Sequence, residues 1–238
     1  MTQNLQQNKK FVKHVFNKVF DKYDLMNDIM SFGIHRIWKD LMMDWLVPRP
    51  GQKLIDVAGG TGDIATRFLD RCKGDAHVKI VDFTEEMIAL GKRKTENYIH
   101  KRHLDWFCAD AMQLPFSGGI FDSYAISFGL RNVVDIKKAL EESYRVLRPG
   151  GRIMILEFST LVDQNLQWLY DKYSFEVIPW LGKFIAKDKE SYQYLVESIR
   201  NFPKQNELVD LMTSVGFKEV KYRNLSMGIV ALHSGWKL

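Results

Sequence analysis

A glycine-rich turn carries the strongest chemical signal in the sequence. It spans Asp56–Asp63 (DVAGGTGD) and follows a short β-rich run. Glycines there let the backbone approach a ligand, and the N-terminus of a following helix offers free N–H groups and a positive dipole. Gly60, Gly62 and Ala65 fit the dinucleotide pattern G-x-G-x-x-A, and Asp82 lies where a ribose-binding acid is expected. The pattern predicts a nucleotide-like ligand, although a purely structural tight turn fits the same residues.

Three features favour S-adenosylmethionine over a nicotinamide cofactor. Asp56 lies inside the strand before the turn, where its carboxylate can orient the turn and face a ligand's ammonium group. Asp110 ends the third predicted strand and suits an adenine amino group. None of the 9 tyrosines is followed four residues later by lysine, so the Tyr-x-x-x-Lys pair of short-chain dehydrogenases is absent. Asp82 suits a ribose hydroxyl, and it equally suits the cap of a helix over Thr84–Asn97.

Alternating β and α patterns position these residues. Strand patterns cover Lys53–Val57, Val78–Val81, Leu104–Ala109, Phe121–Ser127 and Arg152–Phe158. Helical patterns cover Ile34–Val47, Gly62–Arg71, Glu85–Asn97, Asp135–Leu147 and Glu207–Val215. The alternation predicts an α/β fold with a parallel sheet and helices on both faces. Phe217–Leu225 and Ile229–His233 are expected to close it as a hairpin.

No linker divides the chain, so the 238 residues are expected to form one domain. Its predicted parts are an N-terminal helical cap (1–50), a cofactor-binding core (51–160), an aromatic-rich helical insertion (161–203), and a C-terminal helix and hairpin (204–238).

Composition excludes several classes of protein. With 46% hydrophobic and 26% charged residues, the chain is neither disordered nor of low complexity. Cys72 and Cys108 are too few for a disulfide scaffold or a cysteine zinc cluster. His100 and His103 lack an acid or thiol partner at ligand spacing, so no metal is expected. No apolar run approaches the ~18 residues of a membrane span. A cytoplasmic bacterial protein is predicted, or a matrix-side protein if the source is eukaryotic.

Two longer motifs identify a family. The segment Tyr23–Trp38 (YDLMNDIMSFGIHRIW) and the segment Arg145–Ser159 (RVLRPGGRIMILEFS) resemble two signatures of the ubiquinone/menaquinone biosynthesis C-methyltransferases, and the likeness extends over nearly the whole chain. The resemblance implies a class I, Rossmann-like S-adenosylmethionine-dependent methyltransferase with a mostly parallel seven-stranded sheet. It implies methylation of a ring carbon of a prenylated quinol, either demethylmenaquinol, 2-methoxy-6-polyprenyl-1,4-benzoquinol, or both.

The resemblance also assigns contacts with the methyl donor, each after a successive strand of the predicted sheet. Together with the glycine turn, the predicted donor-binding residues are Gly59, Thr61, Asp82, Asp110, Ala111 and Ser127. Their expected position agrees with the rule that open parallel sheets bind ligands at the carboxyl ends of their strands. The hydroxyls of Thr61 and Ser127 also suit turns.

A ring carbon becomes a good nucleophile when a neighbouring phenol loses its proton, so the site needs a proton acceptor or a group that stabilises phenolate. We expect Arg131 to stabilise the phenolate, directly or through a water, and Asn132 to orient the ring oxygen. Arginine is too basic to act as the general base itself. His35 is the alternative proton acceptor, and from its place in the cap it could close over the site, as could Tyr23. A purely structural His35 suits the pattern equally.

The substrate tail predicts apolar and membrane contacts. Aromatic and apolar residues crowd the insertion and suit a tail groove, a dimer contact or ordinary core: Trp168, Tyr170, Tyr173, Phe175, Ile178, Pro179, Trp180, Leu181 and Phe184. An amphipathic helix with lysines around it is predicted over Phe11–Phe20. This helix and the net charge of +5 of the whole chain suit peripheral docking on anionic lipid. The charge is too small to indicate binding to nucleic acid.

Other functions stay open at this point. They are a class I methyltransferase acting on another lipid or phenol, a nicotinamide oxidoreductase, and a lipid-binding or scaffolding subunit of a quinone-synthesis complex. A homodimer is also compatible with the sequence.

Overall fold

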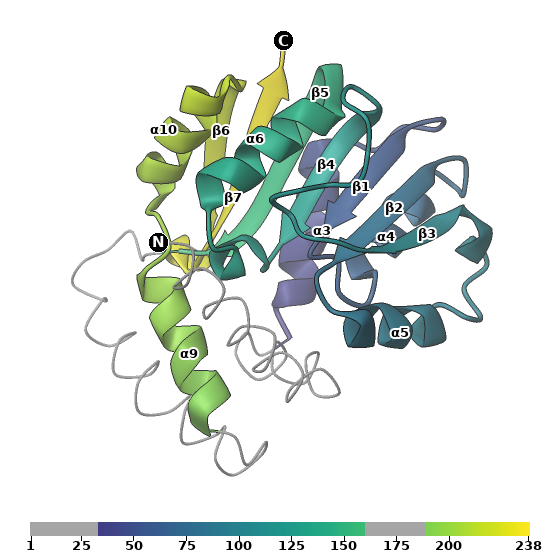
Figure 1. Cartoon of the computed structure of the whole chain (residues 1–238), viewed down its shortest axis with the longest axis horizontal. Helices are drawn as coiled ribbons and strands as arrows, with labels where there is room; N and C mark the ends of the chain where they lie inside the picture. Colours follow the sequence, from purple (N-terminus) through teal and green to yellow (C-terminus); the bar gives the residue numbers. More distant parts are fainter. Residues whose placement is uncertain (1–32, 160–188) are drawn as a thin grey trace.

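The computed structural model describes residues 33–159 and 189–238 (Figure 1). Seven strands form one sheet in the order β3-β2-β1-β4-β5-β7-β6. The strands are β1 Lys53–Val57, β2 His77–Asp82, β3 Leu104–Cys108, β4 Phe121–Ser127, β5 Leu147–Phe158, β6 Lys218–Leu225 and β7 Val230–Lys237. β7 runs antiparallel to β5 and β6, and the other neighbouring strands are parallel. The predicted mostly parallel seven-stranded sheet is therefore confirmed.

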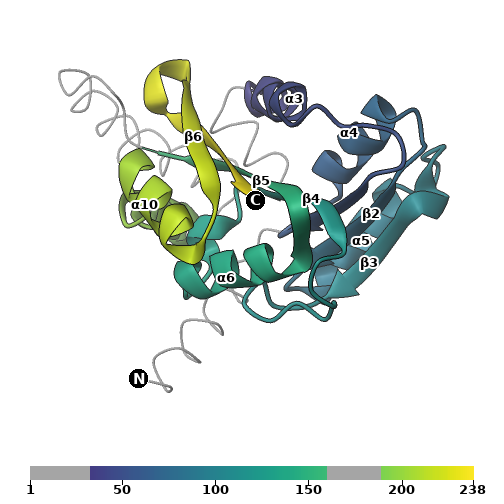
Figure 2. The same cartoon turned by 90° about the horizontal axis from the view of Figure 1, so that it is seen from above.

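Helices cover both faces of this sheet. The α-helices of the described residues are α3 His35–Leu46, α4 Asp63–Arg71, α5 Glu85–Lys94, α6 Ile136–Val146, α9 Lys189–Arg200 and α10 Gln205–Val215. Figure 2 shows α3 and α4 on one side of the sheet and α6 and α10 on the other. In the part of the chain that the structure describes, no helix has the length and apolar character needed to cross a bilayer.

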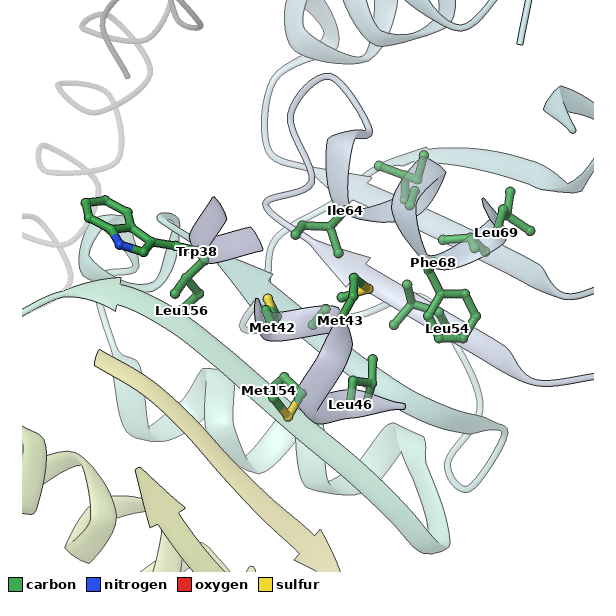
Figure 3. Packing of buried hydrophobic residues seen from close by; sticks show 14 of the residues in the cluster. Trp38, Met42, Met43, Leu46, Leu54, Ile64, Phe68, Leu69, Met154 and Leu156 are labelled. Carbon is green, nitrogen blue, oxygen red and sulfur yellow. The ribbon is translucent and has the colours of Figure 1, made fainter. Parts of the chain in front are cut away.

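Alternation along the strands decides which face each side chain meets. Leu54 of β1 packs with α3 and α4, whereas Ile55 packs on the face that α6 and α10 cover. Asp56 therefore points to the same side as Leu54. Figure 3 shows Met43 of α3 on the side of Ile64 and Phe68 of α4, and Met42 on the side of Met154 and Leu156 of β5. Full burial of such a side chain contributes about 1.5–3 kcal/mol, so apolar packing holds α3 over the core.

The predicted strands and helices within the described residues are confirmed, with shifts at their ends. α5 ends at Lys94 rather than Asn97, and β5 begins at Leu147 rather than Arg152. Leu147 already pairs with Phe121 of β4 before the register shifts. The predicted helix over Phe11–Phe20 and most of the insertion Leu161–Pro203 lie outside the described residues, and α9 is the helical part of the insertion within them.

Candidate donor and acceptor site

Two adjoining cavities open at the carboxyl ends of β1, β2, β3 and β4. β1 pairs with β2 on one side and with β4 on the other, so the order of the strands in the sheet reverses between β1 and β4. Open α/β sheets bind ligands at such switch points. The larger cavity holds about 800 Å³ of empty space and the smaller about 370 Å³, part of each open to solvent. Ala58, Gly60 and Phe128 line both.

The glycine turn forms the floor between the cavities, and its backbone leaves no room for side chains at two positions. A Cβ atom on Gly59 would lie 2.6 Å from Ile80 Cγ2 and 2.9 Å from Asp56 Oδ2. Gly62 has a φ of +82°, and a Cβ there would lie 3.0 Å from the Trp106 ring. The turn consequently requires glycine for close packing and for its left-handed backbone.

Asp82 joins the turn to the start of α5. Its Oδ2 accepts a hydrogen bond from the Gly60 N–H at 3.0 Å, and its Oδ1 accepts one from the Thr84 N–H at 3.1 Å. Burial raises the pKa of Asp82, and the hydrogen bonds from Thr84 and Gly60 oppose that shift. Asp82 also lines the larger cavity. The two predicted roles, ligand contact and support of the helix start, are thus geometrically compatible.

Asp110 and Ala111 line the far side of the larger cavity, next to the apolar side chains of Met87 and Met112. Asp110 Oδ1 accepts a hydrogen bond from the Met112 N–H at 2.9 Å. Apolar walls with an acidic group suit a flat heterocycle that carries an amino group.

Helix α6 holds the loop that carries Asp110. The Leu114 N–H donates to Glu142 Oε2 at 2.8 Å, while Arg145 donates to the Phe116 carbonyl at 2.7 Å and the Leu114 carbonyl at 3.1 Å. Glu142 and Arg145 are themselves paired at 2.6 Å. Hydrogen bonds from α6 therefore hold the loop on the side away from the cavity, and they restrict the position of Asp110 at the cavity wall.

The smaller cavity is the polar one. Predicted residues Gly59, Thr61 and Ser127 line it together with Asp56 and the unpredicted Lys39. Asp56 is fully buried, and among the described residues neither of its carboxyl oxygens has a hydrogen-bond partner. Burial raises the pKa of Asp56 from 3.8 to about 8, with Lys39 opposing the shift. The cavity thus contains a buried acid that needs a cationic or hydrogen-bonding ligand.

Arg131 and Asn132, predicted to act on one ring oxygen, occupy different places. Asn132 lines the larger cavity, whereas Arg131 lines neither. The Arg131 guanidinium donates to Glu157 Oε1 at 2.7 Å and to the Phe128 carbonyl at 2.6 Å. Glu157 also accepts from the Arg131 N–H at 3.3 Å. The structure therefore brings Asn132 to the cavity and places Arg131 behind its wall.

The Asn132 side chain is held by a residue from far along the chain. Its Oδ1 accepts a hydrogen bond from the Tyr194 hydroxyl of α9 at 3.1 Å. Its Nδ2 is buried and has no hydrogen-bond partner among the described residues. This leaves an amide donor at the cavity wall for a ligand oxygen.

His35 and the other predicted residues lie apart from this arrangement. His35 begins α3, is buried, and lines neither cavity, so its role as proton acceptor stays a prediction. Tyr23 and the aromatic residues of the insertion lie outside the described residues. His103 meets His77 edge to face with ring centroids 4.9 Å apart, and the described residues contain no cluster of side chains suited to a metal ion.

Sequence reasoning missed Lys39, Tyr194 and Glu157 as members of the site. Glu157 did carry a signal, because it is a single acid in the otherwise apolar strand segment Ile153–Phe158 and so required a buried partner. Lys39 and Tyr194 carried none, since each lies on an amphipathic helix where charged and aromatic residues are ordinary.

Comparison with known proteins gives consistent results. The model of the ubiE/COQ5 methyltransferase family matches residues 2–237. The ubiquinone/menaquinone biosynthesis C-methyltransferase UbiE of a Ruegeria species is 60% identical over 227 residues, which cover 95% of this chain and 90% of that protein. The protein of the same name from Brucella anthropi is 51% identical over 229 residues, or 95% of this chain and 87% of that one.

Solved structures share the fold at low sequence identity. A Thermotoga maritima protein described as an S-adenosylmethionine-dependent methyltransferase, possible histamine N-methyltransferase, has a TM-score of 0.64 and 19% identity, with 95% of this chain and 100% of that chain covered. The [4+2]-cyclase SpnF has a TM-score of 0.65 and 16% identity, with 85% and 80% covered. Because the cyclase differs in chemistry, this likeness defines the fold alone.

Proposed function

The chain belongs to the ubiE/COQ5 methyltransferase family, and from that membership we propose which of its residues bind the methyl donor and the quinol. It is an S-adenosylmethionine-dependent C-methyltransferase of ubiquinone/menaquinone biosynthesis. The substrate class is a prenylated quinol. The single observation that carries the residue assignment is the pair of adjoining cavities, one polar with a buried acid and one with apolar walls.

The donor spans both cavities in this proposal. Asp110 and Ala111 receive the adenine, and Asp82 receives the ribose hydroxyls. Gly59, Thr61 and Ser127 receive the amino-acid end in the smaller cavity, where Asp56 meets its ammonium group. The support is that three predicted residues line each cavity and that the turn between them is fixed by Asp82. Bound there, S-adenosylmethionine supplies the electrophilic sulfonium methyl group.

Asn132 acts on the acceptor. Its amide Nδ2, unpartnered in the described part of the chain, donates to the quinol oxygen next to the reacting carbon. A donor at that position stabilises negative charge as the phenol loses its proton, and it orients the ring for in-line attack. Tyr194 fixes the amide through Oδ1. Arg131 is a positioning residue: its ion pair with Glu157 holds the turn that carries Asn132.

We also propose peripheral contact with an anionic membrane, where a prenylated substrate resides. The support within the described residues is a row of exposed apolar side chains at helical spacing, the N-cap residue Ile34 and residues Ile37 and Leu41 of α3, of which Ile37 is 58% exposed. The net charge of +5 favours anionic lipid. Flotation with anionic vesicles tests this contact. Binding should weaken with salt and with Ile37→Ser, and binding that is absent or insensitive to salt contradicts it.

Methyl transfer from labelled S-adenosylmethionine to short-chain quinols tests the site assignment. Both demethylnaphthoquinol and methoxybenzoquinol analogues should be assayed, because the ring preference is open. Wild-type protein should label a ring carbon, and Asp110→Ala should raise the donor KM much more than the quinol KM. A variant in which only the quinol KM rises would place Asp110 on the acceptor side and overturn the assignment.

A further inference from the structure

One cationic side chain lines the smaller cavity, and it belongs to a helix that precedes the sheet. Among the described residues that line it, Lys39 is the only lysine or arginine. It belongs to α3, which precedes the first strand and is anchored by its apolar face over the core (Figure 3). The neighbouring Trp38 is fixed as well, because its indole N–H donates to the Ser226 hydroxyl at 3.0 Å. The helix thus delivers Lys39 to a defined place.

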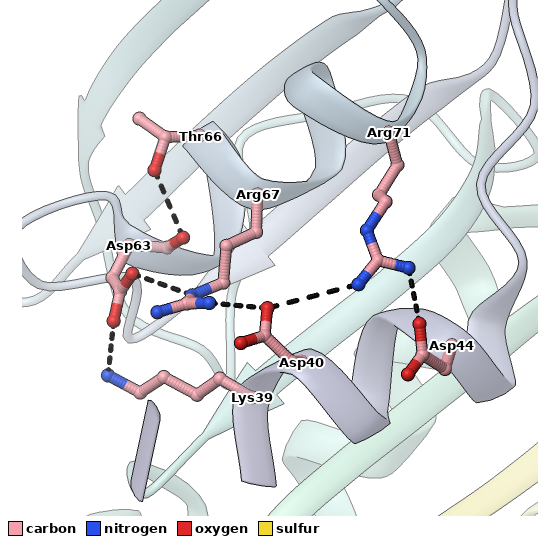
Figure 4. Close-up of polar contacts among 7 residues, drawn as sticks. All are labelled: Lys39, Asp40, Asp44, Asp63, Thr66, Arg67 and Arg71. Atoms are coloured by element: carbon pink, nitrogen blue, oxygen red, sulfur yellow. Dashed lines mark hydrogen bonds and ion pairs between the residues drawn. The ribbon is translucent and has the colours of Figure 1, made fainter. Parts of the chain in front are cut away.

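Burial of the Lys39 side chain is unusual for its type. Lysines on helices normally extend the ammonium group into water, but this side chain is only 9% exposed. Its Nζ lies 2.7 Å from Asp63 Oδ2 on the first turn of α4. Figure 4 marks this ion pair with a dashed line. An ammonium group has three N–H donors, and Asp63 accepts one of them. Donors are therefore left for a ligand in the cavity.

Asp63 does not depend on Lys39 alone. Its other oxygen, Oδ1, accepts from Arg67 Nε at 2.9 Å, and Arg67 also pairs with Asp40 of α3 (Figure 4). Arg67 does not line the cavity. The carboxylate of Asp63 is thus shared between two cations, so Lys39 retains attraction for a further anion. The N-terminus of α4, with Gly62 as its N-cap, adds a positive dipole at the same wall.

Asp56 on β1 requires a ligand group of the opposite charge, a cation rather than an anion. Its buried carboxyl group has no hydrogen-bond partner among the described residues and lines the same cavity as Lys39. Among the described residues, two acids, Asp56 and Asp63, and one cation, Lys39, line this cavity. Asp63 is already shared between Lys39 and Arg67. Asp56 and Lys39 are therefore left to meet the two charges of an α-amino acid terminus, an ammonium group and a carboxylate. A nucleotide phosphate would meet an acid there, and a simple amine would meet a cation.

We propose that Lys39 binds the α-carboxylate of S-adenosylmethionine and, with Asp56 on the ammonium group, makes the cavity specific for the intact amino-acid end of the donor. This inference rests on the proposed donor site. It adds a specificity-determining residue from the N-terminal helix, 24 positions before its partner Asp63. The predicted consequence is discrimination against donors that lack the carboxylate.

Calorimetric binding of two ligands to the full chain tests this role. S-adenosylmethionine and its decarboxylated form differ at the α-carbon, where the second has lost the carboxylate. Each is titrated into wild type, Lys39→Met and Arg67→Met. Methionine keeps much of the lysine's length without its charge. Arg67→Met is the matched control, because it removes the other cation from Asp63 and leaves the cavity lining intact.

Wild type should bind S-adenosylmethionine at least about tenfold more tightly than the decarboxylated ligand, which is the effect of about 1.4 kcal/mol. Arg67→Met should keep a preference for S-adenosylmethionine, reduced because Asp63 then pairs with Lys39 alone. Lys39→Met should bind the two ligands with similar affinity, and Lys39→Arg should recover part of the preference. If Lys39→Met weakens both ligands equally, its role is structural and the proposal is wrong. Wild type that binds neither ligand would instead overturn the donor site itself.

Discussion

Arg131 and Glu157 form an ion pair of 2.7 Å in which the side chains are 2% and 1% exposed. The pair links the turn after β4 to the end of β5, directly behind the wall that carries Asn132. The Phe158 N–H donates a hydrogen bond to Glu157 Oε1 at 2.9 Å, so the carboxylate accepts hydrogen bonds from a side chain and from the backbone. Such a pair sets geometry more than it adds net stability, because both ions lose their hydration.

Removing one partner should therefore cost far more than removing both. Glu157→Leu is expected to lower the free energy of unfolding by about 3–5 kcal/mol, because Arg131 then stays buried without its counter-ion. The double variant Arg131→Met/Glu157→Leu should recover much of that loss. Urea denaturation followed by circular dichroism measures both. Additive losses in the double variant would show that the two side chains are not energetically coupled.

Asn132 should matter for turnover rather than for donor affinity. Loss of a donor to a developing oxyanion typically costs 10²–10³ in rate, so Asn132→Ala should lower kcat by about that factor. Its Kd for S-adenosylmethionine should stay near the wild-type value. Tyr194→Phe, which removes only the hydrogen bond to Oδ1, should lower kcat by about tenfold or less.

Single-turnover methyl transfer at saturating quinol distinguishes these effects from slow product release. Arg131→Ala should also lower turnover, through the position of Asn132. Near-normal turnover in Arg131→Ala at saturating quinol would contradict a contribution of Arg131 to the reaction, and a Tyr194→Phe rate equal to wild type would show that Asn132 needs no support from α9.

The residues predicted from the strand pattern line the two cavities, whereas several residues around them were not predicted, for a topological reason. Asp82 ends β2 and Asp110 comes after β3, and parallel strands end at one edge of a sheet, so their meeting follows from the strand pattern alone. Lys39 reaches Asp63 only because α3 packs across α4 on a shared apolar core. Tyr194 lies 62 positions from Asn132 along the chain. Contacts of that kind depend on how helices pack, which strand patterns do not encode.

The ion pair of Arg131 could not be predicted from the strand pattern either, so we expected Arg131 to meet the phenolate. An arginine after a strand in a ligand-binding edge has the right charge and position to meet a phenolate. The structure instead pairs Arg131 with Glu157 from the neighbouring strand. A nearby cation offsets the cost of burying the Glu157 carboxylate away from water. Glu157 lies in the motif Arg145–Ser159 and Arg131 lies outside it, and their pairing depends on the packing of β4 beside β5.

Asp56 should make the stability of the ligand-free protein fall as pH rises. Burial raises its pKa from 3.8 to about 8, so between these values the folded protein holds a proton that the unfolded chain has released. The free energy of unfolding then decreases by up to about 1.4 kcal/mol per pH unit in this window. Asp82, whose pKa burial also raises, acts in the same direction. Asp56→Asn removes the Asp56 contribution alone.

Denaturation of wild type and Asp56→Asn from pH 5 to pH 9 isolates that contribution, because every other titrating group is common to both. The variant should gain stability relative to wild type as pH rises towards 8, and the difference should level off above it. A difference that does not change with pH would mean that Asp56 is already ionised in the folded protein at pH 5.

Donor binding should release this proton. The ammonium group of S-adenosylmethionine favours ionised Asp56, with Lys39 acting in the same direction and Asp63 and Asp82 opposing it. Below pH 8 the free protein holds the proton and the complex does not, so binding at pH 7 should release close to one proton. Calorimetry in buffers of different ionisation enthalpy counts the protons. Asp56→Asn, which cannot ionise, should lose the release at pH 7 even where it still binds the donor. A release at pH 7 that persists in this variant would assign the proton to another group, and no release in wild type would place the ammonium group away from Asp56.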